Sequence, residues 1–291
     1  MSQELDRINL YERRSISQCL ETTFDFMRVN RRIWLRSTFV LIGPLALLLA
    51  LLLTVVNMAA PEDHHAGLDY FLGWFEFDVP LLAASFGLGL WVVLVNVFTL
   101  VQLYEEYDGK IDRLLVADMW PHWLRCAGRT WWIAVLLTFF IILPFFSDSM
   151  FLGLAWLAVS VPLVLVPSVR LIGHAGVVNT LTKSVSLGFS AWFSLAFTVL
   201  LSLLMAFLVC TVLTFPLTIL DVLSSTFSVD DATPWLLPTG LINFLFCTLA
   251  FFAFFALLSI VVLTTVYQYG NLVERVDAAS VDRDVSNFEN L

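Results

Sequence analysis

A cluster of potential metal ligands stands in PEDHHAGLDYF, residues 61–71, where two acidic residues precede two histidines. Histidine and carboxylate groups bind Zn²⁺ and other transition metals, so Glu62-Asp63-His64-His65 is the first place to look for chemistry. Adjacent histidines on one loop cannot easily point at a single ion, and the chain offers no third histidine near them. We therefore interpret the stretch as a solvated acidic loop, and we predict neither a metal site nor a cofactor.

Signatures of catalysis are absent from the rest of the sequence. It contains no Gly-x-Ser-x-Gly, His-Glu-x-x-His, Walker or Gly-x-Gly-x-x-Gly motif. The acidic run Glu105-Glu106-Tyr107-Asp108-Gly109 lacks the alternating ligands and the distal Glu of a calcium loop, so we expect a solvated helix end there. The sequence therefore predicts a protein that is not an enzyme.

The composition indicates a membrane protein. Of the 291 residues, 59% are hydrophobic and only 13% are charged, against about 25% charged in a typical soluble domain. A helix needs about 20 apolar residues to cross the hydrocarbon core. Continuously apolar blocks of this kind predict helices and exclude the alternating pattern of a barrel. Six blocks without Lys or Arg qualify, at about 38–57, 79–103, 131–147, 150–169, 192–220 and 236–266.

The basic residues set the predicted orientation. All fifteen fall before span one, between spans two and three or four and five, or after span six. Short loops rich in Lys and Arg stay in the cytoplasm, so we expect cytoplasmic termini, an N-terminal segment at 1–37 and a tail at 271–291. The chain 1–291 then forms a single domain, a multi-pass protein of a bacterial plasma (inner) membrane. The other side holds nine of the 24 acidic residues, and the remaining fifteen balance the bases, which argues against nucleic-acid binding.

Three segments before the predicted hairpins are amphipathic, at 15–41, 110–136 and 176–197, and each meets tryptophan where a span begins. Helices with one apolar stripe beside a membrane lie in its interface, where indole rings also concentrate. We predict an all-α bundle of three hairpins, each preceded by a cytoplasmic interfacial helix, although any hairpin with basic flanks resembles this pattern. The predicted apolar faces are Ile16, Cys19, Leu20, Phe24 and Met27, then Ile111, Leu114, Leu115 and Met119, then Val177, Val178, Leu181 and Val185.

The ends of the spans also look alike. LVQLYEEYDG (100–109) and LTTVYQYG (263–270) both close an apolar helix with tyrosines and then glycine, and Gly173 follows span four in the same way. Glycine after the last helical turn readily takes the left-handed conformation that caps a helix. We therefore expect Gly109, Gly173 and Gly270 to be helix caps.

Two short motifs resemble a group of six-span bacterial membrane proteins. TLTKSVSLGFSAWFSLAF has their polar helix, small-residue turn and aromatic start of a span, and YQYGNLVERVD is similar to their ending. The group includes the membrane domain of some glycerophosphodiester phosphodiesterases. Because only 21 residues follow Gly270, we expect no phosphodiesterase domain, and the resemblance implies an architecture without the activity.

Polar residues and prolines inside the spans are the remaining internal features. Asn96 and Asn243 are candidates to line a polar cavity, although such residues more often join neighbouring helices. No charged residue lies within a span, which argues against proton-coupled transport. Two prolines in VPLVLVPSVR predict that span four is the helix most prone to bend.

Basic residues at the predicted inner surface are candidate contacts for lipid headgroups or for a partner. An anionic surface is worth about 1 kcal/mol per basic residue. The same residues satisfy the simpler requirement of holding the inner side in place. They are Arg28, Arg31, Arg32, Arg36, Arg125, Arg129, Arg170 and His174.

These patterns favour a non-enzymatic scaffold or accessory subunit of a membrane complex, whose partners are membrane lipids and another membrane or cytoplasmic protein. The alternative is a channel or transporter for a small or lipidic solute that uses the bent span four. An intramembrane enzyme acting on lipid is a third hypothesis. A continuous polar cavity reaching Asn96 and Asn243 would favour transport, and a tight apolar core with an exposed inner groove would favour the scaffold.

Overall fold

The computed structural model describes residues 8–59, 68–109, 111, 114–142, 150–226 and 239–277, with the backbone path alone for some of these, chiefly 56–59, 68–82, 150–155, 220–226 and 239–243. Every regular element in the described chain is helical, which confirms the all-α class. The helices are α1 (Ile16–Val29), α2 (Arg31–Ala59), α3 (Leu68–Glu106), α4 (Val116–Ile142), α5 (Met150–Leu163), α6 (Val166–Leu171), α7 (Val177–Ser190), α8 (Trp192–Thr226) and α9 (Thr239–Asp277).

Among the described residues, five helices are long and apolar enough to cross a membrane. Their apolar stretches are Arg31–Leu53, Ala83–Glu106, Val116–Ile142, Trp192–Val209 and Cys247–Val276. A shorter apolar stretch, Ala158–Leu171, runs through α5 and α6, where the sequence predicts the fourth span. The described residues therefore have the helices of a multi-pass membrane protein.

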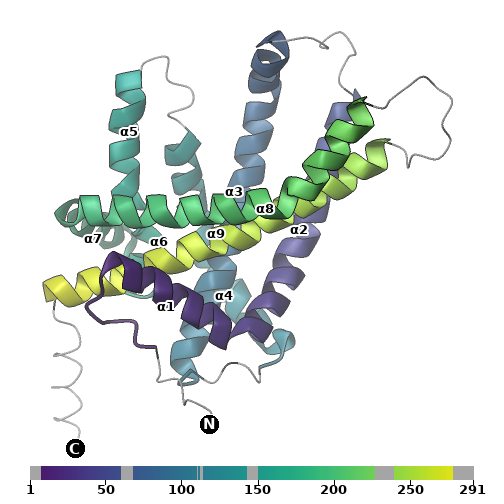
Figure 1. Cartoon of the computed structure of the whole chain (residues 1–291). Coiled ribbons are helices and arrows are strands. Elements are labelled where there is room, and N and C mark those ends of the chain that lie inside the picture. Colours follow the sequence, from purple (N-terminus) through teal and green to yellow (C-terminus); the bar gives the residue numbers. More distant parts are fainter. Residues whose placement is uncertain are drawn as a thin grey trace, which may run out of the picture.

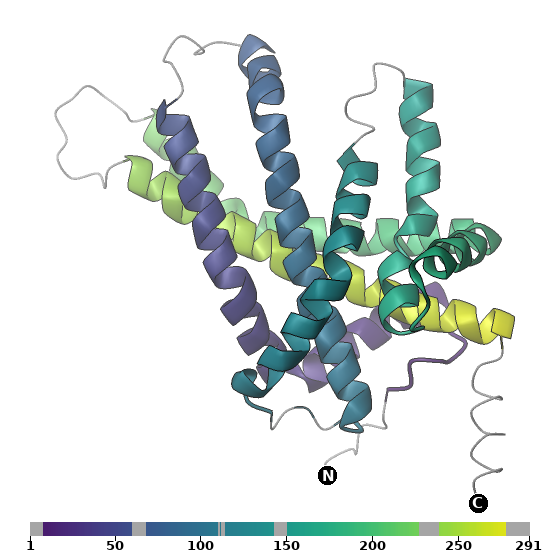
Figure 2. The same cartoon turned by 180° about the vertical axis from the view of Figure 1, so that it is seen from behind.

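The centre of the molecule is formed by α3 and α9. Their apolar stretches are 61% and 67% buried, whereas that of α8 is only 17% buried. Figures 1 and 2 show α8 and α9 running together across α2 and α3, and α2 packs more extensively on α9 than on α3. Close packing depends on Gly89 in α3, because a Cβ atom there would stand 1.9 Å from the Phe255 ring of α9.

The bend predicted within residues 150–169 is present as a complete break. Helix α5 ends at Leu163, a turn covers Val164 and Leu165, and α6 begins at Val166. Proline lacks an N–H group, so Pro162 and Pro167 each remove one bond from the helical ladder. The two prolines thereby explain where the helix stops and restarts.

Neighbouring helices satisfy carbonyl groups at this break. Ala158 would normally accept from residue 162, and instead accepts a hydrogen bond from Trp192 Nε1 in α8 at 2.9 Å. Ser184 Oγ in α7 donates to the Pro162 carbonyl at 2.7 Å. The Pro162 carbonyl also accepts from the Leu165 N–H at 3.2 Å. A polar backbone group is expensive to leave unpaired in an apolar setting, so Trp192 stabilises the broken helix by pairing Ala158, and Ser184 adds a second bond at Pro162.

Two of the three predicted interfacial helices exist as separate helices. α1 and α7 each have 14 residues, and a single non-helical residue, Asn30 or Ala191, separates each from the long helix that follows. The prediction is wrong for the second segment, where α4 runs from Val116 to Ile142 without a break. Helix α4 begins at Val116, three residues before Met119, the last residue of the predicted apolar face. Asp118 accepts a hydrogen bond from the Leu115 N–H at 3.2 Å and so caps the helix at this point.

The three predicted glycine caps are likewise confirmed only in part. Gly109 has φ +80° after the end of α3, which agrees with a left-handed cap. After α6 the left-handed residue is His174, at φ 49°, and not Gly173. Helix α9 passes through Gly270 and continues to Asp277, so the prediction of a helix cap at Gly270 is wrong.

Candidate functional site

Helix α9 carries a row of polar residues near its C-terminal end. Thr264, Gln268, Asn271 and Arg275 are spaced by four, three and four residues, so they lie on one side of the helix. The first three are buried. They meet α1, α8 and the N-terminal segment Ile8–Ser15, and we call this contact the polar seam.

Gln268 joins three helices at the centre of the polar seam. Its Nε2 donates to Ser194 Oγ of α8 at 3.0 Å, and its Oε1 accepts from the Cys19 Sγ of α1 at 3.3 Å. One turn earlier on α9, Thr264 Oγ1 accepts from Thr23 Oγ1 at 3.2 Å. Polar bridges of this kind usually contribute about 0.6–2 kcal/mol each between membrane helices.

The N-terminal segment is bound to the last turns of α9. Asn271 Oδ1 accepts from the Arg14 N–H at 3.0 Å, and Arg275 Nη2 donates to the Arg14 carbonyl at 3.0 Å. Gly270 permits this approach, because a Cβ atom there would stand 2.2 Å from the Leu10 carbonyl oxygen. The glycine that the sequence suggested as a helix cap is therefore a point of close chain contact.

The side chain of Arg14 is buried, at 6% exposed, and folds the segment around itself. Its guanidinium donates to the carbonyls of Asn9 and Leu10 and to Glu12 Oε2, the last at 2.6 Å. It also stands 5.5 Å from the centre of the Tyr267 ring, a cation–π distance. Because the buried guanidinium of Arg14 has this many partners, it fixes the N-terminal segment in the fold.

Phe26 of α1 contacts the C-terminal parts of α3 and α9, whose sequences resemble each other. Its ring lies 5.0 Å from Tyr104 of α3 and 6.4 Å from Tyr267 of α9, both edge to face. The Tyr104 hydroxyl also accepts a hydrogen bond from the Ile8 N–H at 3.2 Å. The two tyrosines therefore position α1 and the N-terminal segment together.

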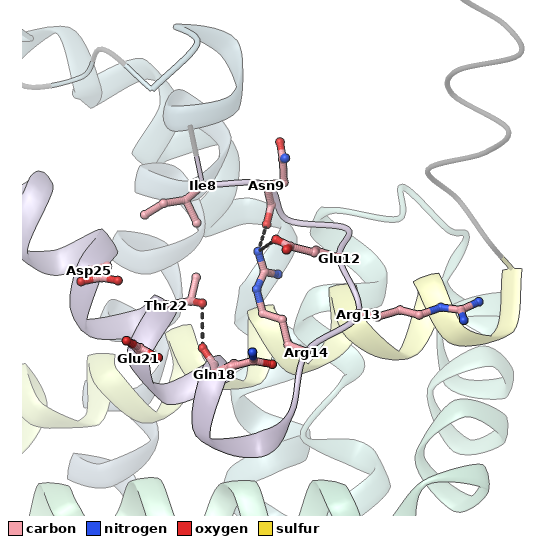
Figure 3. A pocket seen from close by; sticks show the side chains of 9 residues that line it. All are labelled: Ile8, Asn9, Glu12, Arg13, Arg14, Gln18, Glu21, Thr22 and Asp25. Atoms are coloured by element: carbon pink, nitrogen blue, oxygen red, sulfur yellow. Dashed lines mark hydrogen bonds and ion pairs between the residues drawn. The ribbon is translucent and has the colours of Figure 1, made fainter. Parts of the chain in front are cut away.

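A hollow of about 260 Å³ opens between the N-terminal segment and α1. Figure 3 shows Glu21 and Asp25 extending from α1, and Glu12 from the segment. Glu12 is paired with Arg14, which leaves two carboxylates and the exposed Arg13 as the charges available to a ligand. The complete lining is Ile8, Asn9, Glu12, Arg13, Arg14, Gln18, Glu21, Thr22 and Asp25.

Cys19, which follows Gln18 of the hollow's lining in α1, is fully buried. Burial raises the pKa of Cys19 to about 11, although the positive charges of Arg14 and Arg275 act in the opposite direction. The nucleophilic form of cysteine is the thiolate. Cys19 is therefore a neutral hydrogen-bond donor to Gln268 and not a reactive group at neutral pH.

Six of the predicted basic contacts are exposed and lie near one end of the molecule, around the junction of α1 with α2 and the start of α4 (Figures 1 and 2). None of the six makes a hydrogen bond or ion pair with a residue that the structure describes. They are Arg28, Arg31, Arg32, Arg36, Arg125 and Arg129. Arg170 differs, because its Nη1 donates to the Ala175 carbonyl and holds the turn between α6 and α7, in which His174 is exposed.

Of the two predicted polar-cavity residues, the structure describes the side chain of Asn96 alone. Asn96 is fully buried in α3, where its Nδ2 donates to Thr38 Oγ1 of α2 at 3.3 Å, and it does not line the hollow beside α1. The side chain of Asn243 and the stretch Glu62-Asp63-His64-His65 lie outside the described residues. In the part that is described, no three His, Cys, Asp or Glu side chains form a metal-binding group.

Sequence reasoning missed the polar seam and Arg14. The spacing of Thr264, Gln268, Asn271 and Arg275 was visible as a helical row, but the predicted end of span six near 266 divided it. Arg14 was counted only as one basic residue among fifteen. Nothing in its sequence neighbourhood indicates burial, which depends on α9 arriving from the far end of the chain.

The fold and the polar seam together define an all-helical membrane-type protein with a polar, charge-lined face beside its central helix. Comparison with protein-family models, with curated proteins and with solved structures gives no match to this chain. The functional argument therefore depends on the residues themselves.

Proposed function

We propose that this protein is a non-enzymatic scaffold or accessory subunit in a bacterial inner membrane, with six spans in three hairpins and cytoplasmic termini. The α5–α6 pair serves as the fourth span. The face that carries α1, the hollow and the exposed arginines is then cytoplasmic. Its partner is a cytoplasmic or membrane protein, and lipids surround the remaining helix surfaces.

The observation that carries this proposal is how the polar side chains among the apolar helices are used. Asn96 bonds to Thr38, and Gln268 bonds to Cys19 and Ser194. Gln102 of α3 donates to the Leu171 carbonyl at 3.2 Å and accepts from Cys126 at 3.4 Å. Polar groups that join helices in this way favour a rigid core, and the hollow beside α1 is a polar surface that remains open.

The charges of the hollow suggest the chemistry of its partner. Glu21 and Asp25 project from one side of α1, while Arg28 and Arg31 are exposed at the junction with α2. A protein segment with Lys or Arg opposite the carboxylates and an acidic residue opposite the arginines would complement both. Such complementary pairs chiefly determine the specificity and the rate of association.

The test is affinity purification of the tagged protein in nanodiscs, followed by mass spectrometry and by binding measurements with the partner so identified. Glu21→Lys with Asp25→Lys should remove a stoichiometric partner, because the reversed charges repel its basic groups. Glu105→Lys with Glu106→Lys makes the same charge change on exposed residues at the end of α3 and should leave binding intact. Equal loss in both pairs, or no loss in either, would contradict a partner at the hollow.

The break between α5 and α6 supports a second candidate, transport of a small or lipidic solute, since broken helices often mark substrate sites in transporters. Trp192 and Ser184 already satisfy carbonyls at this break, which favours a structural role. Solute or lipid flux in proteoliposomes that depends on Pro162 and Pro167 would reverse the preference. The resemblance to phosphodiesterase membrane domains stays a prediction and does not distinguish the two functions.

A further inference from the structure

A second hollow, of about 470 Å³, is an apolar groove between α3 and α4. The α3 side of the groove is lined by small residues, which leave its volume unfilled: Ala83, Ala84 and Gly87. Trp131 and Phe139 of α4 line it and are more than half exposed, so the groove opens sideways along the helices. Its volume lies within the range of about 300–1,000 Å³ that is usual for ligand sites.

Contacts between the two helices hold the groove open. At Gly87 the helices come so close that a Cβ atom would stand 3.0 Å from Thr138 Oγ1. At the end nearer the start of α4, Trp91 Nε1 donates to the Ala127 carbonyl at 3.3 Å. A close approach and a hydrogen bond therefore fix the separation of the groove's walls.

A pair of arginines extends the groove at the same end. Arg125 and Arg129 are exposed, and neither bonds to a residue that the structure describes. Phe139 follows Arg125 by 14 residues, so on an ideal helix Arg125 lies about 21 Å from Phe139 along the axis of α4 and about 40° round it. Arg129, ten residues before Phe139, lies about 80° round the helix, so both arginines stand towards the Phe139 side of the groove. Charge and apolar surface thus follow one another along one helix.

We propose that the groove and the arginine pair bind one anionic phospholipid. One acyl chain occupies the groove from Trp131 to Phe139, a length of about 12 Å along the helix, which fits within one leaflet of a hydrocarbon core about 30 Å thick. Trp131 then lies at interfacial depth, where indole is favoured. The phosphate meets Arg125 and Arg129 in the headgroup region. This site does not depend on the scaffold role, which involves α1.

Native mass spectrometry of the full-length protein in mild detergent tests the proposal. The protein is titrated with phosphatidylglycerol and, separately, with phosphatidylcholine of the same acyl chains. Replacing both basic residues, Arg125→Gln with Arg129→Gln, should weaken the first phosphatidylglycerol about 30-fold. Phosphatidylcholine should weaken much less, because its choline group already balances the charge of its phosphate. The control pair Arg32→Gln with Arg36→Gln removes the same charge from exposed positions of α2 and should leave the first lipid bound as tightly as before.

Filling the groove tests the chain-binding half. Ala84→Phe should displace the first lipid of either headgroup, and Leu88→Trp, at a rim position already 39% exposed, is a second filler that does not enter the core. Circular dichroism and gel filtration confirm that each variant is folded. The proposal is overturned if both arginine pairs weaken phosphatidylglycerol equally, or if a folded groove-filling variant retains the first lipid at unchanged affinity.

Discussion

Helices α1 and α7 have the same local plan and different surroundings. Each has 14 residues, each is followed by one non-helical residue, and each leads into a long apolar helix. α1 places Cys19, Thr23 and Phe26 against its neighbours and leaves charged residues such as Glu21 and Arg28 outside. α7 buries Thr180, Ser184, Leu187 and Gly188, and leaves Val178, Val185 and Phe189 exposed.

The difference shows that the apolar stripe of an amphipathic helix is not always its packing face. For α7 the sequence correctly found an apolar stripe, but the neighbouring row of small residues packs on α5, and Val178 is 75% exposed. Small residues let helix backbones approach closely in an apolar medium. The apolar stripe of α7 then faces outward, as expected for a helix in contact with lipid, whereas the outer face of α1 suits water.

The largest expected effect is on the α1 side. Arg14→Met removes the donors for the Asn9 and Leu10 carbonyls and for Glu12, and should lower the free energy of unfolding by about 2–3 kcal/mol. Unfolding in mixed micelles with increasing denaturing detergent measures the change. Arg13→Met is the matched control, because Arg13 is exposed, and equal effects of the two would show that Arg14 does not organise the segment.

The corresponding change on the α7 side should be slightly smaller. Gly188→Ala places a Cβ atom 2.6 Å from Pro162 Cα and should destabilise by about 1–3 kcal/mol through overpacking. Gly128→Ala in α4 meets nothing within 4 Å and should be neutral or slightly stabilising. Thermal unfolding in nanodiscs compares the two, and a stable Gly188→Ala variant would mean that α7 does not approach α5 this closely.

Removing one hydroxyl from α7 should cost about 1–2 kcal/mol. Ser184→Ala leaves the Pro162 carbonyl without its side-chain donor at the break in the fourth span. Ser186→Ala, two residues away on an exposed position, should have no effect on the same unfolding curve. If Ser184 and Ser186 behave alike, the break does not need α7 for its stability.

An acidic residue placed on the outward face of each helix compares the surroundings of α7 and α1. The expected change in the free energy of unfolding is at most about 1 kcal/mol. A charge on a lipid-facing residue near the interface costs about 0–1 kcal/mol, so Val185→Asp, away from the ends of α7, should destabilise the protein in bilayers. Phe24→Asp on the exposed side of α1 should change little, since that face contacts water. Unfolding midpoints in nanodiscs measure both, and the reverse order would exchange the surroundings assigned to the two helices.

Ionisation of the Cys19 thiol should affect the free energy of unfolding only at alkaline pH. Because the pKa of Cys19 is raised from its ordinary value near 9 to about 11, ionisation favours the unfolded chain. The stabilising contribution is therefore complete below pH 9 and is lost as the pH rises towards 11. The difference in unfolding midpoint between the wild type and Cys19→Ser should shrink over that window, and a difference independent of pH would contradict a buried neutral thiol.

Several features of the fold could be predicted because they depend on local chemistry. The prolines 162 and 167 lack N–H groups wherever they stand, so the break in the fourth span was predictable. The periodicity of residues 16–29 and 177–190 predicted α1 and α7. The prediction of a second interfacial helix was wrong, because an amphipathic stripe does not reveal where a helix starts. Helix α4 begins at Val116, where Asp118 caps it, and so leaves Ile111 and Leu114 outside the helix.

The candidate site was less accessible to sequence reasoning. The exposed arginines around α1, α2 and α4 were identified correctly as surface residues, since an unpaired charge is costly to bury. Arg14 was missed because its burial requires partners from its own loop and from α9, 257 residues away at Asn271. The groove between α3 and α4 was also missed, since it depends on Gly87 and Thr138 meeting across two helices.

The sequence by itself determined the helical class, the apolar stretches, the break between α5 and α6, and the amphipathic character of α1 and α7. These follow from solvation, periodicity and backbone chemistry, which act within a few residues. Only the tertiary structure decided which face of each amphipathic helix packs, where Gly270 lets the chain pass, and how Gln268 and Arg14 find partners. Such choices depend on distant helices meeting in space, because a buried polar group is tolerated only where another element completes its hydrogen bonds.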